Sequence, residues 1–311
     1  MISLILNSLI PLSLCIIAGK LLRRYGFVAD TVWQGIDKLN YYVLFPSLLF
    51  LSIARADVAL GEFGLVVAVV AVVMAIAVAG LLLAKIILKV SHHNIGVYTQ
   101  STIRFNTYVG LALVASLFGD DGMTLFSLII AIFIPIINVI SVLSLTAHQG
   151  LSISGVLLNL LKNPLIISCL AAMAYNATSL PVPTMAVDLL SMFGAASLPL
   201  GLLCIGAGLK FGRINDLGSD VMTAHAAAVW LNSAIRLFAM PAIAFVLCTV
   251  MGLVGLDQQV VTLFFALPTA PTAYVLTKVL GGNHPLMAQI ISMQTALAML
   301  SLPAVLAVLL V

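Results

Sequence analysis

Charged side chains are scarce in this sequence. Only 7% of its 311 residues are Asp, Glu, Lys or Arg, whereas 63% are hydrophobic and the mean hydropathy is +1.24. A soluble domain does not need so much apolar surface, and apolar runs of roughly 18 residues or more recur along the chain. No domain-sized hydrophilic loop separates these runs. The composition therefore indicates an all-α polytopic membrane protein that works within the lipid bilayer.

Motifs for catalysis, metal binding and disulfide formation are also lacking. The four cysteines lie in apolar runs without CxxC spacing, which is typical of buried structural thiols. The five histidines have no HExxH or His/Cys ligand spacing, and no Ser–His–Asp or paired-carboxylate arrangement is present. The net charge of +3 comes from scattered basic residues, so nucleic acid is not an expected partner. We expect no enzyme activity, cofactor or metal site.

The N-terminal apolar run lacks the basic residues that precede the core of a signal peptide. Residues 2–17 are instead followed by Lys20, Arg23 and Arg24, which suits a first span that enters the membrane from outside. With that orientation, 10 of the 13 basic residues lie in cytoplasmic linkers or helix ends, one (Arg55) lies outside and two lie within spans. The positive-inside rule therefore predicts that both termini are outside, in the periplasm of a bacterial cell.

The apolar runs predict ten membrane-spanning helices. Each is close to the roughly 20 residues that a crossing helix needs, and their expected ranges are 2–22, 36–54, 62–88, 96–118, 123–147, 163–178, 185–209, 222–252, 259–280 and 285–310.

Matched proline positions indicate that these spans form a repeat. Pro11 and Pro46 are 35 positions apart (46 − 11), and so are Pro164 and Pro199 (199 − 164). Because each copy holds an odd number of spans, the second copy is inverted in the membrane. We therefore expect a 5+5 inverted repeat, with its two halves at residues 1–150 and 151–311.

The expected ninth span is interrupted by two prolines. Pro268 and Pro271 lie in its middle, beside Thr269 and Thr272. Each proline removes a backbone N–H and clashes with the preceding turn, so a helix breaks or kinks here. Hydrocarbon cannot satisfy the freed carbonyl groups, so the break has to face protein or a water-filled cavity.

The expected fourth span, within Thr102–Gly122, has an amide at the equivalent place. Asn106 precedes Gly119 by 13 positions, and Pro268 precedes Gly281 by the same 13 positions. Paired interrupted segments, one in each half of a membrane protein, indicate the substrate site of a transporter.

Two cations lie within the expected spans, Arg104 and Arg236, and no Asp or Glu lies mid-span to pair with them. A buried charge costs at least ~2.5 kcal/mol, so carbonyls and amides or an anionic substrate must stabilise each one. We expect Arg104 to attract an anion and Arg236 to pack structurally against span nine or ten. Asn138, Asn232 and Gln294 are expected to form hydrogen bonds between helices.

The N-terminal ends of broken helices carry partial positive charge, which suits a carboxylate. Asn106 either contacts such a substrate or only bonds a neighbouring helix. The predicted substrate-binding residues are Arg104, Asn106, Thr107, Gly110, Pro268, Thr269, Pro271 and Thr272.

Five motifs in order resemble the auxin efflux carrier family of bacterial and plant transporters. They are Tyr41–Phe50 (YYVLFPSLLF), Arg104–Asn106 followed by Gly110-Leu111 and Phe118-Gly119, Asn163–Ile166, Pro199-Leu200 with Gly206–Leu209, and Leu267–Thr269. The resemblance covers essentially the whole chain. One departure is Ala112, where many members have a proline after the Gly-Leu pair.

This resemblance implies a ten-helix inverted-repeat fold, shared in outline with bile-acid/sodium symporters. Spans one, two, six and seven would form a scaffold, and spans three to five and eight to ten a transport domain whose fourth and ninth helices are broken and cross. It further implies elevator-type secondary transport of a small organic anion, such as a mono- or dicarboxylate or an auxin-like acid, by a homodimer. The short fifth linker favours a bacterial inner membrane protein. Alternatives are a sodium-coupled symporter of the bile-acid type and a passive anion channel, and the coupling ion, H⁺ or Na⁺, stays open.

Overall fold

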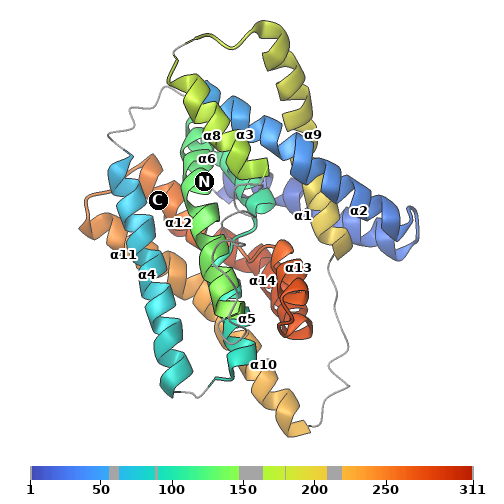
Figure 1. The fold of residues 1–311 in the computed structure, drawn as a ribbon, viewed down its shortest axis with the longest axis vertical. Coiled ribbons are helices and arrows are strands. Elements are labelled where there is room, and N and C mark those ends of the chain that lie inside the picture. Colours follow the sequence, from blue (N-terminus) through green and yellow to red (C-terminus); the bar gives the residue numbers. More distant parts are fainter. Residues whose placement is uncertain are drawn as a thin grey trace.

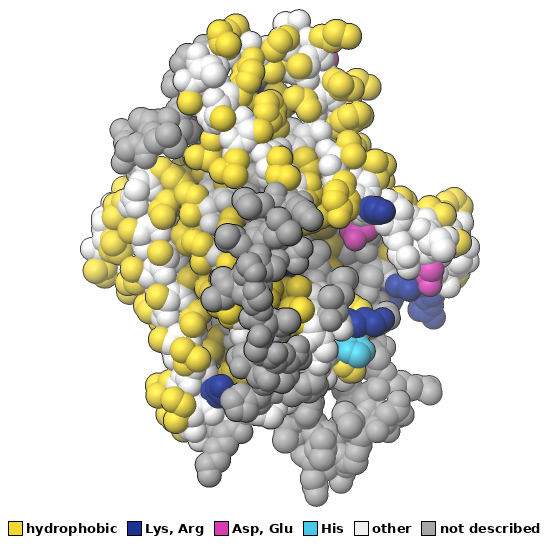
Figure 2. Space-filling view, viewed as in Figure 1, with side chains coloured by type: hydrophobic (Ala, Val, Ile, Leu, Met, Phe, Trp, Pro, Cys, Tyr) yellow, Lys and Arg dark blue, Asp and Glu magenta, His cyan; other side chains and the backbone are white. Residues whose placement is uncertain are grey.

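A computed structural model describes residues 2–55, 63–87, 90–146, 164–178, 180–208 and 219–309. Within these ranges every regular element is a helix (Figure 1). Among the side chains that Figure 2 colours by type, most are apolar, and Lys and Arg appear at only a few positions. Among the described residues, five stretches are long and apolar enough to cross a membrane, at Gly64–Ile87, Asn94–Thr146 (interrupted at residues 104–106), Thr184–Gly208, Ala226–Val250 and His284–Leu309. The predicted all-α membrane protein is confirmed.

The helices follow the expected spans closely. Those of the first half are α1 (Ile2–Arg24), α2 (Asp30–Leu39), the π-helical η1 (Asn40–Leu44), α3 (Phe45–Ala54), α4 (Gly64–Ile87), α5 (His92–Ile103) and α6 (Thr107–Thr146). Those of the second half are α8 (Pro164–Asn176), α9 (Thr184–Gly208), α10 (Ser219–Ala234), the π-helical η3 (Ile235–Ala239), α11 (Met240–Val250), α12 (Leu256–Ala266), α13 (Thr272–Val279) and α14 (His284–Leu309). The expected boundary between the halves, at residues 150 and 151, lies outside the described residues.

The number of membrane crossings stays a prediction, because several helices do not have the length of one crossing. The helices α12 and α13, which residues 267–271 separate, contain 11 and 8 residues, about half of what a crossing needs. By contrast, α6 runs for 40 residues and bends at Gly119, where φ is 60° and ψ is −148°. Glycine adopts this conformation without the penalty that a side chain would add, so the bend divides α6 where the fourth span was expected to end.

Two helices contain a π-helical segment shortly before a proline. The segment η1 ends two residues before Pro46, and η3 ends two residues before Pro241. Both prolines lie in the first turn of the following α-helix, where a missing N–H costs little. Short π-helical segments widen a helix locally and are frequent at functional sites. Arg236 lies within η3.

The helices α1 and α3 pack against helices of the second half. The helix α1 lies along α9, and α3 contacts both α8 and α9. Two glycines allow α1 and α9 to approach closely. A Cβ atom at Gly19 would collide with the backbone of Leu203, and one at Gly206 with the backbone of Ile16. In Figure 1 α3 lies near the top, α2 and α9 toward the right, α4 and α11 toward the left and α10 at the bottom. The assignment of spans to a scaffold and a transport domain stays a prediction.

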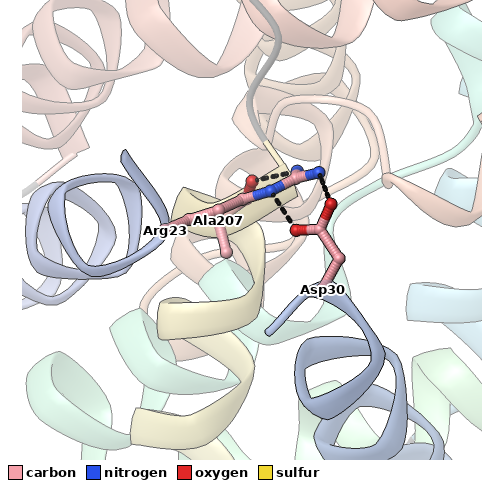
Figure 3. Close-up of polar contacts among 3 residues, drawn as sticks. All are labelled: Arg23, Asp30 and Ala207. Atoms are coloured by element: carbon pink, nitrogen blue, oxygen red, sulfur yellow. Dashed lines mark hydrogen bonds and ion pairs between the residues drawn. The ribbon is translucent and has the colours of Figure 1, made fainter. Parts of the chain in front are cut away.

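The ends of these helices are capped in a reciprocal way. Arg23, near the end of α1, donates to the carbonyl of Ala207 near the end of α9 (2.6 Å) and pairs with Asp30 (2.9 Å), as Figure 3 shows. Asn176, at the end of α8, donates to the carbonyl of Ile53 in the last turn of α3 (3.2 Å). In each case the first helix of one half caps the end of a helix in the other half. These bonds satisfy carbonyls that a helix C-terminus leaves without a partner.

Candidate functional site

Both interruptions that the sequence predicts are present. Residues 104–106 separate α5 from α6, and residues 267–271 separate α12 from α13. The backbone is extended at Arg104 (φ −75°, ψ 146°) and at Leu267 (φ −66°, ψ 141°), so each helix stops abruptly rather than bending. We refer to these two segments as break 1 (104–106) and break 2 (267–271).

The two breaks touch each other. The backbone N–H of Asn106 donates to the carbonyl of Pro268 at 2.7 Å. Beside this bond, the ring of Phe105 lies 4.4 Å from the ring of Phe264 in the last turn of α12, measured between ring centroids. This bond pairs two backbone groups that lie 162 positions apart (268 − 106). Neither group has a hydrogen-bond partner within its own interrupted helix.

Gly110 allows break 2 to approach α6 closely. A Cβ atom at this position would lie 2.7 Å from the Leu267 side chain and 2.5 Å from the Phe126 ring. Ala112, at the place where the resemblance leads one to expect a proline, is buried inside α6. The helix is already interrupted before Thr107, so break 1 does not depend on a proline at position 112.

Asn106 forms the N-cap of α6 and leaves one donor unused. Its Oδ1 accepts the N–H of Val109 at 3.3 Å, and its carbonyl accepts the N–H of Gly110 at 2.9 Å. Its Nδ2 is fully buried and has no hydrogen-bond partner within the described structure. A buried donor without a partner costs about 1–3 kcal/mol. A bound acceptor would recover that free energy.

Thr269 provides a second unused polar group in break 2. Its N–H donates to Oε1 of Gln294 at 2.9 Å, whereas its hydroxyl is buried and without a partner in the described residues. Buried polar groups are rarely left in this state, and each exception calls for an explanation. A bound polar molecule is one such explanation.

The other predicted site residues form a more accessible edge. Thr107 and Pro271 are partly exposed and Thr272 is exposed, whereas Asn106 and Thr269 are buried. Thr107 begins α6 and Thr272 begins α13. Each helix N-terminus carries the equivalent of about +0.5 charge, and its first N–H groups have no partner within the helix.

Arg104 lies at the same edge and contacts only neutral side chains. Its guanidinium donates to the hydroxyls of Ser141 (3.2 Å) and Thr272 (3.4 Å) and to the Asn138 side-chain oxygen. Within the part of the chain that the structure describes, no Asp or Glu side chain pairs with Arg104. The positive charge of Arg104 is therefore balanced by dipoles alone, which leaves it able to attract an anion.

Arg236 is fully buried and bonds only to backbone carbonyls. Its Nε donates to Leu267 (2.8 Å), its Nη1 to Thr102 (2.8 Å) and its Nη2 to Phe264 (3.2 Å). Thr102 lies in the last turn of α5, and the other two lie at the end of α12. The predicted structural role next to span nine agrees with these contacts, but the sequence does not predict the contact with the last turn of α5, just before break 1.

Two further polar side chains converge on the breaks. Asn232 of α10 donates to the Thr102 hydroxyl at 3.0 Å. Gln294 of α14 donates to Oδ1 of Asn232 (3.2 Å) and to the carbonyl of Ser101 (3.3 Å) while it accepts from break 2. The sequence predicts hydrogen bonds between helices for both amides, but it gives no signal that they meet at one place.

The fold and the site together define a polytopic helical membrane protein with paired, interrupted helices, the arrangement in which transporters bind substrates. Residues 4–306 match the membrane transport protein family, which is the family of the auxin efflux carriers, and the chain belongs to it. An uncharacterized transporter from Methanocaldococcus jannaschii is 21% identical over 288 residues, which cover 87% of this chain and 86% of that protein. The family predicted from the motifs is confirmed.

Proposed function

We propose that the protein is a secondary transporter of a small organic anion, such as a mono- or dicarboxylate or an auxin-like acid. The observation that carries this proposal is the buried, unpartnered Nδ2 of Asn106 at the point where the two breaks touch. Its free N–H group calls for an acceptor, and a carboxylate oxygen is a strong one.

The charges around the breaks favour an anion over a cation or a neutral solute. Arg104 contributes one positive charge, and the N-termini of α6 and α13 contribute about half a charge each. Residues 104–106 and 267–271 contain no Asp or Glu. Thr107, Pro271 and Thr272 would line the accessible edge, and Pro268 and Gly110 would shape the buried wall.

The proposed mechanism is elevator-type alternating access within a 5+5 inverted repeat of ten helices. The reciprocal caps between α1 and α9 and between α8 and α3 support the repeat. Tyr108, in the first turn of α6, rests against Gly201 of α9 and stacks on Phe45 of α3, with 4.3 Å between the two ring centroids. Its hydroxyl donates to Asp37 of α2 (3.3 Å), so this side chain marks where the proposed transport domain meets the proposed scaffold.

The proposed setting is a bacterial inner membrane with both termini outside and a homodimeric assembly. The bias of basic residues toward one side supports the orientation. The resemblance alone supports the dimer.

The test is uptake of labelled mono- and dicarboxylates and of an indole acid by vesicles that contain the purified protein. It is run with and without a Na⁺ or pH gradient. We expect saturable uptake of at least one anion and a loss of about tenfold or more in Asn106→Ala. Asn176→Ala, which removes an amide at a helix end far along the chain from the breaks, is the matched control.

Saturable uptake that persists in Asn106→Ala would refute the site while leaving the transporter class intact. Flux that does not saturate would favour a passive channel. If no anion is transported, the proposed substrate class is wrong.

A further inference from the structure

We propose that Arg236 is a built-in cation that holds the two breaks together, so that transport by this protein does not require Na⁺. This inference rests on the proposed transport function and deepens it, because it concerns the ion coupling of the same site. It is carried by the three carbonyls that Arg236 bonds and by their places at two helix ends.

A helix that stops inside a protein leaves the carbonyls of its last turn without a partner. Break 1 creates such an end in α5, and break 2 creates one in α12. Each end carries the equivalent of about −0.5 charge. Two such ends in a buried place need about one positive charge, and in transporters with broken helices these carbonyls coordinate the coupling cation.

Arg236 supplies that charge from the chain itself. Each of its three guanidinium nitrogens donates to one backbone carbonyl. The acceptors are Thr102, Phe264 and Leu267, at distances of 2.8–3.2 Å. The side chain is completely inaccessible to solvent. One guanidinium charge balances two half-charges, so no second cation is needed at these oxygens. The planar fork of arginine reaches three separate acceptors, which the compact ammonium of lysine cannot do equally well.

The side-chain oxygens around this cluster already accept hydrogen bonds. Oε1 of Gln294 accepts from Thr269, and Oδ1 of Asn232 accepts from Gln294. The Thr102 hydroxyl accepts from Asn232. Each of these oxygens therefore already uses one of its two acceptor positions within the protein. The helix-end carbonyls themselves have Arg236 as their cation.

The first experiment measures uptake by the wild-type protein in vesicles with equal concentrations of Na⁺, K⁺ or choline. The probe is the anion that the panel above identifies. We expect rates that agree within about twofold, because the helix ends carry their own cation. A loss of about tenfold or more in K⁺ and in choline would overturn the proposal and favour the sodium-coupled alternative.

The second experiment needs no substrate, so it can be read even if the proposed function fails. It measures the thermal unfolding midpoint of the detergent-solubilised protein in Na⁺ and in choline. Arg236→Ala should lower the midpoint by about 5 °C or more, since three carbonyls lose their donors. Na⁺ should raise the midpoint of this variant, by giving the bare carbonyls a cation, and should leave the wild type unchanged.

The matched control is Arg104→Ala, which removes the other intramembrane arginine but no bond to a helix-end carbonyl. Its midpoint should not respond to Na⁺. If Arg236→Ala does not accumulate in a folded state, Arg236→Met takes its place, and we expect the same response to Na⁺ because this variant also lacks the charge. A substituted protein as stable as the wild type in choline, or a wild type that Na⁺ stabilises as much as the variant, would overturn the proposal.

Discussion

Arg104 and Arg236 lie at the same pair of breaks, but their partners differ in kind. Arg104 is partly exposed and donates to side chains of Ser141, Thr272 and Asn138. Arg236 is buried and donates to carbonyls that the backbone fixes in place. A side-chain partner can rotate away and be replaced by a ligand, whereas a helix-end carbonyl cannot. This difference supports our proposal that Arg104 serves the substrate and Arg236 the architecture.

The largest expected effect is on stability, from Arg236→Met. Met fills the space of the aliphatic stem but leaves the three carbonyls without a donor, which should lower the free energy of unfolding by on the order of 3 kcal/mol. Denaturant unfolding in detergent measures this quantity. If Arg236→Met is as stable as the wild type, the buried arginine is not what holds the helix ends.

A substitution of Arg104 should act on transport rather than on stability. Arg104→Gln keeps hydrogen-bonding capacity without the charge, so we expect KM for the anion to rise about 10- to 100-fold while the unfolding free energy changes by less than about 1 kcal/mol. Saturation curves for uptake measure the former. Arg104→Lys should recover part of the affinity, because it restores the charge but not the planar fork. An unchanged KM would contradict the assignment.

The contact between the breaks can be altered without changing either arginine. In Gly110→Ala the new Cβ would push against Leu267 and Phe126, at a cost of about 1–3 kcal/mol. We expect a lower unfolding midpoint together with slower uptake. Gly80→Ala is the matched control, since it lies in the helix α4 with no atom within 4 Å of its new Cβ, and helical Gly→Ala changes are neutral or slightly stabilising there. Equal behaviour of the two variants would refute close packing at break 2.

The smallest effect is expected at a third arginine, which is near the surface. The Arg23 and Asp30 side chains are 34% and 66% exposed, so solvent screens their attraction and Asp30→Asn should cost no more than about 1 kcal/mol. Arg23→Gln should cost somewhat more, because Arg23 also caps α9 through Ala207. A double substitution measured by unfolding separates the two contributions. A larger loss in Asp30→Asn than in Arg23→Gln would contradict this order.

The positions of the breaks could be predicted because their cause is local. Pro268 and Pro271 cannot continue a helix, and Asn106 is a good N-cap residue. The residues within each segment are therefore enough to predict that the helix is interrupted there. The bounds of most helices follow from apolar runs for the same reason. The matched distances from Gly119 and Gly281 also predict that the two breaks occupy equivalent places in the two halves.

The partners of the polar residues could not be predicted, because they are set by the packing of distant segments. Nothing near Arg236 in the sequence indicates that its acceptors are the carbonyls of residues 102, 264 and 267. Every residue has a backbone carbonyl, so residue types do not show which of them will accept a hydrogen bond from a side chain. The partners of Gln294 could not be predicted either. Its amide oxygen accepts from Thr269 in break 2, and its amide nitrogen donates to Asn232. The π-helical segments η1 and η3 were also missed, because the sequence before a proline does not distinguish a π-helical turn from an α-helical one.

The reciprocal caps have a consequence for how the protein is assembled. Arg23 from the first half completes the end of α9, and Asn176 from the second half completes the end of α3. During synthesis the end of α3 therefore waits for Asn176, which follows Ile53 by 123 positions, whereas Arg23 is made 184 positions before the carbonyl of Ala207 that it caps. Neither half can satisfy its own helix ends alone. Two separately expressed halves should consequently be unstable by themselves and should associate when they are made in the same cell.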